Sequence, residues 1–347
     1  MRTLVILGGG TAGTMAANKL RAKLPRGDWR IVVVDQDDIH DYQPGYLFIP
    51  FGINTPDQVR RSTHAFLHDG IDFVIAEVDI VEPAEKRVRL VGGRELDYDY
   101  LIIASGTTPR PDQTPGMLGD HWHDSVGEFY TFDGAIALRD ALARFNGGRL
   151  VMHITELPIK CPVAPLEFVM LADDYLRERG LRERTEIVYV TPLDGAFTKP
   201  VASRELGHHL ETRGITVEPD FMIESVDPDR KVIVSYDERE VGYDLLVTVP
   251  LNMGADFVAR SGLGDELNYV PVDKHTMQST AYETIFALGD ASNIPTSKAG
   301  SVAHFSVEVF VENFLELIAG RPMTHRFDGH ANCFVESGGG KALLLDF

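Results

Sequence analysis

The chain has no long apolar segment and no excess of positive charge. No run among its 347 residues approaches the 18 or more apolar residues of a membrane-spanning helix. Its 33 lysines and arginines are outnumbered by 52 aspartates and glutamates, and the formal net charge is −19. This balance argues against nucleic acid as a partner and against docking on anionic lipid through charge alone. With 44% hydrophobic and 24% charged residues, the composition is that of a folded globular protein of two or three domains.

Cysteine is also scarce, because Cys161 and Cys333 are the only two. The N-terminus passes from Arg2 directly into an apolar run and a glycine turn, so we expect no signal peptide and a cytoplasmic protein. In a reducing compartment two cysteines rarely form a structural disulfide, and a disulfide that does form there is more often catalytic. The alternative is two separate buried thiols that act as small hydrophobic side chains.

The start of the chain carries a dinucleotide-binding pattern. An apolar run, Thr3–Leu7, precedes Gly8, Gly10 and Gly13 in the spacing GxGxxG, and a helical pattern follows. A second apolar run ends in Asp35, 22 residues after Gly13, where an acidic side chain can bind a ribose hydroxyl. The strand, the turn, the helix and the acid together predict a real dinucleotide site.

A second unit of this type begins at Gly148 but lacks the glycines of its phosphate turn. The apolar run Leu150–Ile154 is followed by TELPIKCP at 155–162, with Cys161 at the crest. Side chains in such a turn keep the backbone N–H groups and the helix N-terminus away from a pyrophosphate. We therefore expect a thiol where a second nucleotide would bind.

The order of predicted strands and helices indicates an α/β protein with two Rossmann-like domains, the second one degenerate. We expect one strand over 71–81, a helix over 128–145, and an irregular aromatic loop over 39–52 that either covers a flat ring system or packs as a hydrophobic loop. The predicted division is a first domain in two parts, a second Rossmann-like domain and a C-terminal segment: 1–112 and 251–320, 113–250, and 321–347.

Several motifs resemble the two-dinucleotide-binding-domain flavoproteins, the pyridine nucleotide–disulfide reductase superfamily, over nearly the whole chain. The general marks are GGGTAG with Asp35, YDYLIIASGT at 98–107 and IFALGD at 285–290. Within this superfamily the chain resembles sulfide:quinone oxidoreductase and flavocytochrome c sulfide dehydrogenase. The marks of that resemblance are YQPGYLFIPFG at 42–52, KCPVAPLE at 160–167, SKAGSVAHF at 297–305 and CFVE at 333–336.

The resemblance implies a non-covalently bound FAD, with the carboxylate of Asp290 on its ribityl chain. No cysteine is present in 39–52 to attach the flavin. We assign no metal site. The residues assigned to FAD are Gly8, Gly10, Thr11, Ala12, Gly13, Asp35, Gln43, Pro44, Val78, Ser105, Gly106, Thr107, Gly289, Asp290, Lys298 and Ala299.

The resemblance also implies the reaction, which is the oxidation of sulfide to sulfane sulfur through a Cys161–Cys333 disulfide. Attack of HS⁻ on the disulfide leaves a persulfide on one cysteine and a thiolate on the other. Two electrons then pass through FAD to a quinone. The cysteines are 172 residues apart in the sequence, so only the fold can bring them together.

Four further side chains, besides the flavin-domain Lys298, are candidates for this site. Lys160 beside Cys161 could stabilise a thiolate, and Glu167 could carry a proton. Both have plain structural alternatives, a solvated lysine and an acid favoured by the first turn of a helix. Phe334 and Phe347 are assigned to a quinone ring, although an aromatic side chain beside a cysteine is also ordinary core. Lys298 could stabilise reduced flavin or lie in a solvated loop.

The chain departs from the family pattern in three ways. It has no third cysteine in 110–148, no histidine in 191–200, and only a short apolar patch, ALLLDF, at 342–347 where relatives carry amphipathic C-terminal helices. We therefore expect one of three explanations: a C-terminal tail missing from the given chain, weak peripheral contact with the cytoplasmic face of a membrane, or a soluble electron acceptor.

The sequence leaves three functions open. The first is a sulfide:quinone oxidoreductase, and the second is a flavin–disulfide sulfide dehydrogenase that uses a cytochrome or another protein as its acceptor. The third is a non-catalytic flavin-binding subunit of a larger redox complex. A homo-oligomer is compatible with all three.

Overall fold

The computed structural model describes residues 1–346, so the predicted role of Phe347 concerns a residue outside the described range. One part of the fold is organised around a five-stranded parallel sheet in the order β20-β9-β1-β2-β5. Continuous runs of buried Val, Ile and Leu, typical of parallel strands covered on both faces, form the central strands. The strands are β1 (Arg2–Leu7), β2 (Trp29–Asp35), β5 (Asp72–Ile75), β9 (Tyr100–Ile103) and β20 (Ile285–Ala287).

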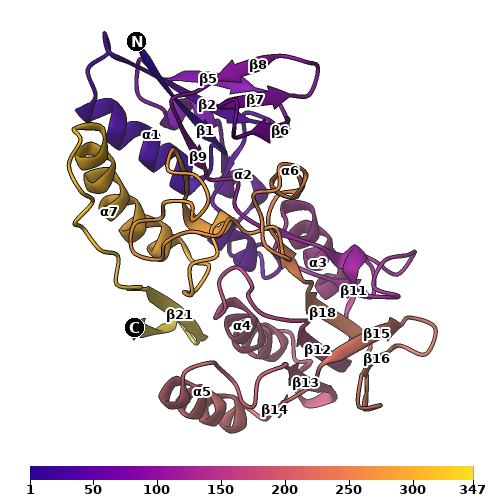
Figure 1. The fold of residues 1–347 in the computed structure, drawn as a ribbon. Helices are drawn as coiled ribbons and strands as arrows, with labels where there is room; N and C mark the ends of the chain where they lie inside the picture. The colour runs from indigo at the N-terminus through magenta and orange to yellow at the C-terminus, as the bar shows by residue number, and fades with distance from the viewer. Residues whose placement is uncertain (347) are drawn as a thin grey trace.

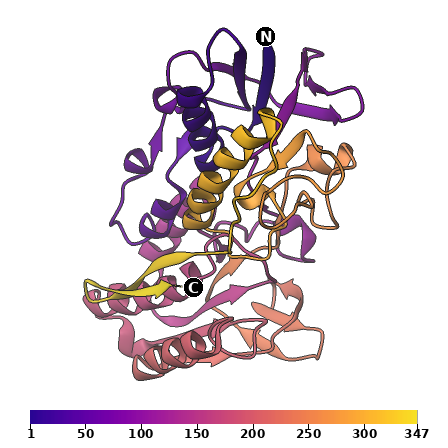
Figure 2. The same cartoon turned by 60° about the vertical axis from the view of Figure 1, so that its left-hand side comes forward.

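Two helices from opposite ends of the chain pack together against this sheet. They are α1 (Thr11–Lys23) and α7 (Gly300–Ile318), which lie side by side in Figures 1 and 2. A small antiparallel sheet of β6 (Val78–Glu82), β7 (Arg87–Leu90) and β8 (Glu95–Asp97) shares their hydrophobic core. The return of the chain at 285–318 therefore completes the sheet that its first residues begin.

The second parallel sheet has the order β11-β18-β12-β13-β14 and its own core. Its strands are β11 (Val126–Gly127), β12 (Gly148–Ile154), β13 (Thr185–Val190), β14 (Ile215–Glu218) and β18 (Leu245–Val249). The helices that accompany it are α3 (Phe132–Arg144), α4 (Ala164–Glu178) and α5 (Pro200–Thr212). A second antiparallel sheet contains β15 (Ile223–Asp227), β16 (Val232–Ser235) and β17 (Glu240–Gly242). The predicted α/β class with two Rossmann-like sheets is confirmed.

Two short strands, β10 (Thr108–Pro109) and β19 (Asn252–Met253), pair antiparallel where the chain passes between the two sheets. The segments that leave and re-enter the first sheet thus run side by side. The other short elements are β3 (His40–Asp41), η1 (Gln43–Phe48), α2 (Pro56–Val59), β4 (Arg60–Arg61), η2 (Thr63–Phe66), η3 (Pro111–Gln113), η4 (Arg182–Arg184), α6 (Asp256–Arg260) and η5 (Gly289–Ala291).

The chain ends in a β-hairpin that belongs to neither large sheet. Strands β21 (Asn332–Gly338) and β22 (Lys341–Asp346) pair with each other, and β21 packs against α4. Both views place this yellow hairpin beside the second sheet although α7, just before it in the sequence, covers the first (Figures 1 and 2). The C-terminal segment therefore bridges the two halves.

Three local predictions need correction. The predicted strand over 71–81 is two strands, because the chain leaves the parallel sheet after Ile75 and begins β6 in another sheet at Val78. The predicted loop over 39–52 contains a 3-10 helix, η1, with Pro44 in its first turn. The predicted helix over 128–145 begins only at Phe132. There the Thr131 side chain caps it by accepting the Gly134 N–H at 3.0 Å.

Candidate functional site

The first glycine turn has the close packing that a dinucleotide cradle needs. Gly8 has a φ of +108°, and a Cβ there would collide with the carbonyl oxygen of Ala104. A Cβ at Gly13 would collide with the carbonyl oxygen of Gly8. Gly10, in contrast, faces open space and precedes the first residue of α1, whose N-terminus has no side-chain cap within the described chain. The N–H groups of this helix are thus available to a phosphate.

The polar groups around this turn also fit a dinucleotide. Asp35 is the last residue of β2, and its carboxylate accepts the Gly9 N–H at 2.5 Å and the Gln36 N–H at 2.7 Å. Burial raises the pKa of the Asp35 carboxyl, opposed by these two backbone donors. The buried hydroxyl of Ser105 has no hydrogen-bond partner among residues 1–346. A buried hydroxyl without a partner is costly, so a bound group that accepts a hydrogen bond from Ser105 would stabilise this region.

The turn at residues 155–162 is attached to the segment around Lys298. The Cys161 N–H donates to the carbonyl oxygen of Lys298 at 2.7 Å, and the Lys160 N–H donates to Oδ1 of Asn252 at 3.1 Å. Cys161 has a φ of +44°, a left-handed conformation that is costly for a residue with a side chain. The Tyr130 hydroxyl donates to the carbonyl oxygen of Cys161 at 3.3 Å. These bonds from three segments hold the cysteine in that conformation.

Two lysines lie near Asp290 of the Gly289-Asp290 motif. Lys298 Nζ donates to the backbone oxygens of Asp290 at 2.8 Å and Ser292 at 3.1 Å, and stands 3.5 Å from the centroid of the Tyr269 ring. Burial lowers the pKa of Lys298 to about 8, opposed by the charge of Asp290. Burial raises the pKa of Asp290, opposed by Lys298 and then by Lys160.

Lys160 is held by neutral acceptors. Its ammonium donates to Oε1 of Gln43 at 3.1 Å and to the carbonyl oxygen of Tyr130 at 3.4 Å. Desolvation lowers the pKa of Lys160, opposed by the charges of Asp290 and Glu128. Lys298, Lys160 and Asp290 are therefore near enough for the charge of each lysine to stabilise the charged form of the carboxylate.

The two cysteines pack against the same apolar cluster, although they come from different elements. Cys161 lies three residues before α4 and Cys333 lies on β21; both are partly buried free thiols. Burial raises the pKa of Cys161, and the charges of Glu167 and then Cys333 raise it further. Burial and the charge of Glu167 also raise the pKa of Cys333. The thiols are thus near enough to influence each other, and the predicted disulfide between them stays a prediction.

Glu167 lies in the first turn of α4, beside both thiols. Its Oε1 accepts the backbone N–H of Glu336 at 2.8 Å. Burial raises the pKa of Glu167 to about 7; the Glu336 N–H opposes this shift, and the Glu336 charge adds to it. A carboxyl group with this pKa can give or take a proton at neutral pH.

The other assigned residues are distributed around this centre. Gly289 has a φ of +61°, and a Cβ there would lie 3.1 Å from the Cβ of Ala12. The Gly289-Asp290 motif therefore packs against the glycine turn at residues 8–13. The Thr107 hydroxyl donates to the carbonyl oxygen of Met253 at 2.8 Å. Gly106 also has a positive φ, of +69°. Pro44 is in η1, Thr11 begins α1, and Ala299 precedes the first residue of α7.

Two assigned residues do not face the apolar cluster that holds the thiols. Val78 begins β6 and is buried in the core of the first sheet. The Phe334 side chain is 74% exposed and pairs across the hairpin with Leu344, which is 58% exposed. Because side chains alternate along a strand, Phe334 points to the face opposite Cys333 and Val335.

Sequence reasoning did not select Asn252, Tyr269 or Tyr130. Asn252 is completely buried and binds the turn through Lys160. The Tyr269 hydroxyl donates to the carbonyl oxygen of Asn252 at 2.7 Å, and its ring faces Lys298. A polar residue just past the buried strand 245–249 was the available signal for Asn252, since ligands bind at the carboxyl ends of parallel strands. The two tyrosines had no local signal.

A cavity of about 750 Å³ lies beside the turn at residues 155–162 and the Lys298 segment. The turn residues Leu157, Ile159 and Pro162 form an apolar wall, and Tyr269 and Lys298 contribute polar groups. This volume is within the range of small-molecule sites.

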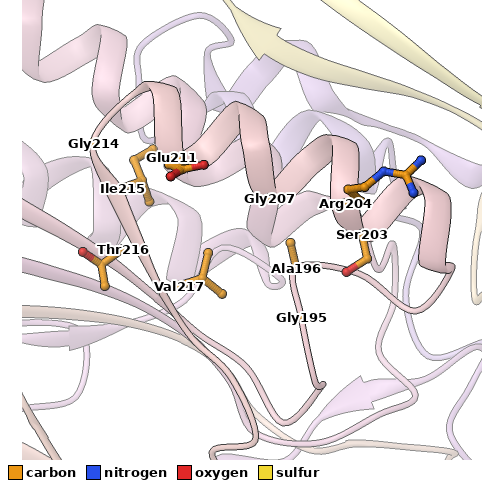
Figure 3. Close-up of a pocket in the computed structure, with 10 residues that line it drawn as sticks. All are labelled: Gly195, Ala196, Ser203, Arg204, Gly207, Glu211, Gly214, Ile215, Thr216 and Val217. Atoms are coloured by element: carbon orange, nitrogen blue, oxygen red, sulfur yellow. The ribbon is translucent and has the colours of Figure 1, made fainter.

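A second cavity, of about 600 Å³, lies apart from these residues, between α5 and the edge strand β14 (Figure 3). All of its lining residues come from 195–217, a range that contains none of the predicted site residues.

The described chain contains neither a membrane-spanning helix nor a cluster of metal ligands. No helix within residues 1–346 is both long and apolar enough to cross a membrane. In the same residues, no group of three or more His, Cys, Asp or Glu side chains could hold a metal ion.

Comparison with known proteins shows what this chain is similar to. Residues 2–152 match the family described as pyridine nucleotide-disulphide oxidoreductase. The mitochondrial sulfide:quinone oxidoreductase of Dictyostelium discoideum is 28% identical over 99% of this chain and 77% of its own length. The protein of the same name from Mus musculus is 25% identical over the same shares.

Among solved structures, the sulfide:quinone oxidoreductase of Aquifex aeolicus superposes with a TM-score of 0.86 at 18% identity. The alignment covers 100% of this chain and 87% of that one. At this identity the likeness shows the fold alone. Together with the sequence matches, it identifies the chain as an oxidoreductase with the flavin- and dinucleotide-binding fold of the pyridine nucleotide-disulphide oxidoreductases, and as a homologue of the proteins named sulfide:quinone oxidoreductase.

Proposed function

We propose that the protein oxidises sulfide to sulfane sulfur or polysulfide through a Cys161–Cys333 disulfide and passes two electrons through FAD to a quinone. The observation that carries the proposal is the packing of both cysteines against one part of the protein. They come from elements 172 residues apart and pack on one apolar cluster. The Cys161 turn is hydrogen-bonded to the Lys298 segment that follows the Gly-Asp motif. The names of the relatives support the substrate assignment.

The residues that would hold FAD without a covalent bond fit it sterically and chemically. The N–H groups at the start of α1 would bind the pyrophosphate, and Asp35 would bind a ribose hydroxyl. Ser105 and Asp290 would bind polar groups nearer the ring, where the Ser105 hydroxyl has no partner within the described residues. The bound flavin supplies a two-electron acceptor that can be reoxidised by a quinone.

The protein's own thiols carry out the sulfur step. HS⁻ attacks one sulfur of the disulfide, a new S–S bond forms and the old one breaks, which gives a persulfide on one cysteine and a thiolate on the other. The thiolate then holds the electron pair of the oxidation. Burial and the charge of Glu167 raise the pKa of both cysteines, so a free thiolate is unfavourable here. Glu167, with its pKa of about 7, would exchange a proton with it.

The positive charges have a separate role in this proposal. Lys298 lies next to Asp290, held by two carbonyl oxygens and the Tyr269 ring. A cation there would favour the reduced, more negative form of a flavin. Lys160 adds a second positive charge near Asp290 and is linked to η1 through Gln43.

The electron acceptor in this proposal is a quinone. Phe334 and Phe347 are our candidates for a quinone ring. The exposed Phe334–Leu344 pair on the hairpin would meet a quinone at the surface rather than in the core. The same apolar pair would allow weak peripheral contact with the cytoplasmic face of a membrane. A cytochrome or another soluble protein is the second candidate acceptor, for which the net charge of −19 is suited if the partner is basic.

We further propose that the chain functions as a two-part FAD domain, 1–112 and 251–320, a thiol-bearing domain, 113–250, and a C-terminal segment, 321–347. The two parallel sheets and the separate hairpin support this division. Homo-oligomers are compatible with it.

A stopped-flow experiment on the flavin-loaded protein tests the function. Sulfide should bleach the flavin absorbance, and NADH should not, because the second phosphate turn lacks glycine. Cys161→Ser and Cys333→Ser should each abolish bleaching by sulfide. Sulfide turnover at the wild-type rate in both variants would refute the disulfide mechanism. Reoxidation by decylubiquinone but not by cytochrome c would select the quinone, and the reverse result would select a protein acceptor.

A further inference from the structure

The position of Cys333 depends on a hairpin that has little support of its own. Strands β21 and β22 form a two-stranded sheet, and among the described strands they pair only with each other. An isolated two-stranded hairpin is marginally stable in water. Contacts with the rest of the protein must therefore decide where Cys333 lies.

One arginine and one aspartate bind the tip of this hairpin. Arg213, the residue after α5, donates through Nη2 to the carbonyl oxygen of Ser337 at 2.6 Å and through Nη1 to Asp174 on α4 at 3.0 Å. The other carboxylate oxygen of Asp174 accepts the Gly339 N–H. The tip is thus bonded to α4 and, through Arg213, to the end of α5.

The shape of the tip fits this contact. Gly338 has a φ of +77°, and a Cβ there would collide with Asp174 Oδ2 and lie 2.9 Å from Nη2 of Arg213. Only glycine allows the backbone to approach the two charged side chains this closely.

Arg213 is itself held in place by a buried carboxylate. Its Nη1 also donates to Asp173 at 2.9 Å, and the Asp173 side chain has no exposed surface. Asp173 also binds Arg177 and Arg182. Burial would raise the pKa of Asp173, but hydrogen bonds from these three arginines hold it below its usual value. Asp173 thus stays charged and keeps two partners when Arg213 is removed.

We propose that Arg213 and Asp174 are positioning residues for the thiol pair, because they fasten the hairpin tip to α4 and so keep Cys333 opposite Cys161. Cys161 lies just before α4, so α4 is the common support of both cysteines. Ser337 is four residues from Cys333, about 13 Å along a strand, and the Glu336 N–H bond to Glu167 lies between them. The inference rests on the proposed function in taking the two thiols as a reactive pair.

The equilibrium of the thiol pair with glutathione measures this positioning. In the full-length, flavin-loaded protein, two thiols and one oxidised glutathione give one Cys161–Cys333 disulfide and two reduced glutathiones. This equilibrium reports the effective concentration of one thiol at the other. Arg213→Ala should lower the effective concentration about tenfold, as expected for loss of a hydrogen bond from a charged donor. Arg213→Lys should restore part of it.

Arg177→Ala is the matched control. Arg177 also binds Asp173, at 3.1 Å, but it bonds to no residue of the hairpin in the described chain. This variant should keep the wild-type equilibrium, whereas a general weakening of α4 would lower it in both variants. Asp174→Ala provides a second, independent removal of the tip contact. It should lower the effective concentration in the same direction as Arg213→Ala.

Hydrogen–deuterium exchange of the hairpin gives a readout that does not depend on thiol chemistry. Arg213→Ala and Asp174→Ala should speed amide exchange in 332–346, and Arg177→Ala should not. Wild-type exchange and a wild-type glutathione equilibrium in both tip variants would overturn the proposal. If oxidised glutathione produces no Cys161–Cys333 disulfide in the unaltered protein, the disulfide part of the proposed function fails. Faster exchange confined to the hairpin in Arg213→Ala and Asp174→Ala would then still support the role of these residues in fastening the hairpin tip to α4. Unchanged exchange would reject that role.

Discussion

The carboxyl group of Glu167 should make the stability of this protein depend on pH near neutrality. Burial raises its pKa from 4.5 to about 7, so the charged form is disfavoured in the folded state. A group whose pKa is raised on folding contributes its full stabilisation at a pH below its pKa in the unfolded state. That stabilisation is lost as the pH rises through its pKa in the folded state. The wild-type protein should therefore lose stability between pH 5 and pH 8.

Glu167→Gln removes this titration with little change in shape. The glutamine carbonyl can still accept the Glu336 N–H, which Glu167 Oε1 accepts at 2.8 Å. A pKa difference of about 2.5 corresponds to about 3 kcal/mol over the full pH range, at 1.36 kcal/mol for each unit. Of this, about 2.5 kcal/mol falls between pH 5 and pH 8. The variant should gain this amount relative to the wild type over that interval.

Thermal unfolding at the two pH values measures the effect. For 347 residues, the unfolding entropy at about 2.1 cal/mol/K per residue converts 2.5 kcal/mol into a relative Tm shift of about 3 °C. Glu156→Gln is the control, because Glu156 lies in the same stretch of chain with an exposed side chain. It should keep the wild-type pH dependence. A Tm difference between Glu167→Gln and wild type that is the same at both pH values would refute the reasoning.

Two further changes test the cradle and the turn. Gly13→Ala should greatly reduce the flavin content of the purified protein, because its Cβ collides with the Gly8 carbonyl, while Gly27→Ala, in open space, should not; full flavin content in Gly13→Ala would contradict the predicted cradle. Asn252→Leu leaves the Lys160 N–H without its acceptor, so it should destabilise the protein by about 1–3 kcal/mol and slow flavin reduction by sulfide. Wild-type unfolding and reduction rates would show that Asn252 does not hold the turn.

Much of the fold could be predicted from local sequence. The strand, glycine turn, helix and acid over 3–35 form a pattern whose parts are neighbours in the chain. Their geometry follows from sterics at Gly8 and Gly13. The second unit was recognisable for the same reason, and its missing glycines singled out Cys161. The break between Ile75 and Val78 was missed because both strands are apolar and local pattern does not say which sheet a strand joins.

The arrangement of the site depended on contacts between distant segments. Asn252 is 92 residues from Lys160, and Arg213 is 124 residues from Ser337. Such bonds leave no periodic trace in either segment, because each partner looks like an ordinary polar residue of its own strand, helix or loop. Even Phe334, next to a cysteine, faces outward because of the alternation of β21, which becomes informative only once the buried face is known.

The sequence alone determined that the chain would form two nucleotide-binding folds and that a thiol would replace the second phosphate turn. Those features rest on backbone sterics and on residues adjacent in the chain. Only the tertiary structure decided that Cys333 would pack against the same apolar cluster as Cys161, because β21 lies against α4, the helix that follows the Cys161 turn. Burial of Glu167 in the same region was also a tertiary outcome, since desolvation depends on every segment that covers a side chain.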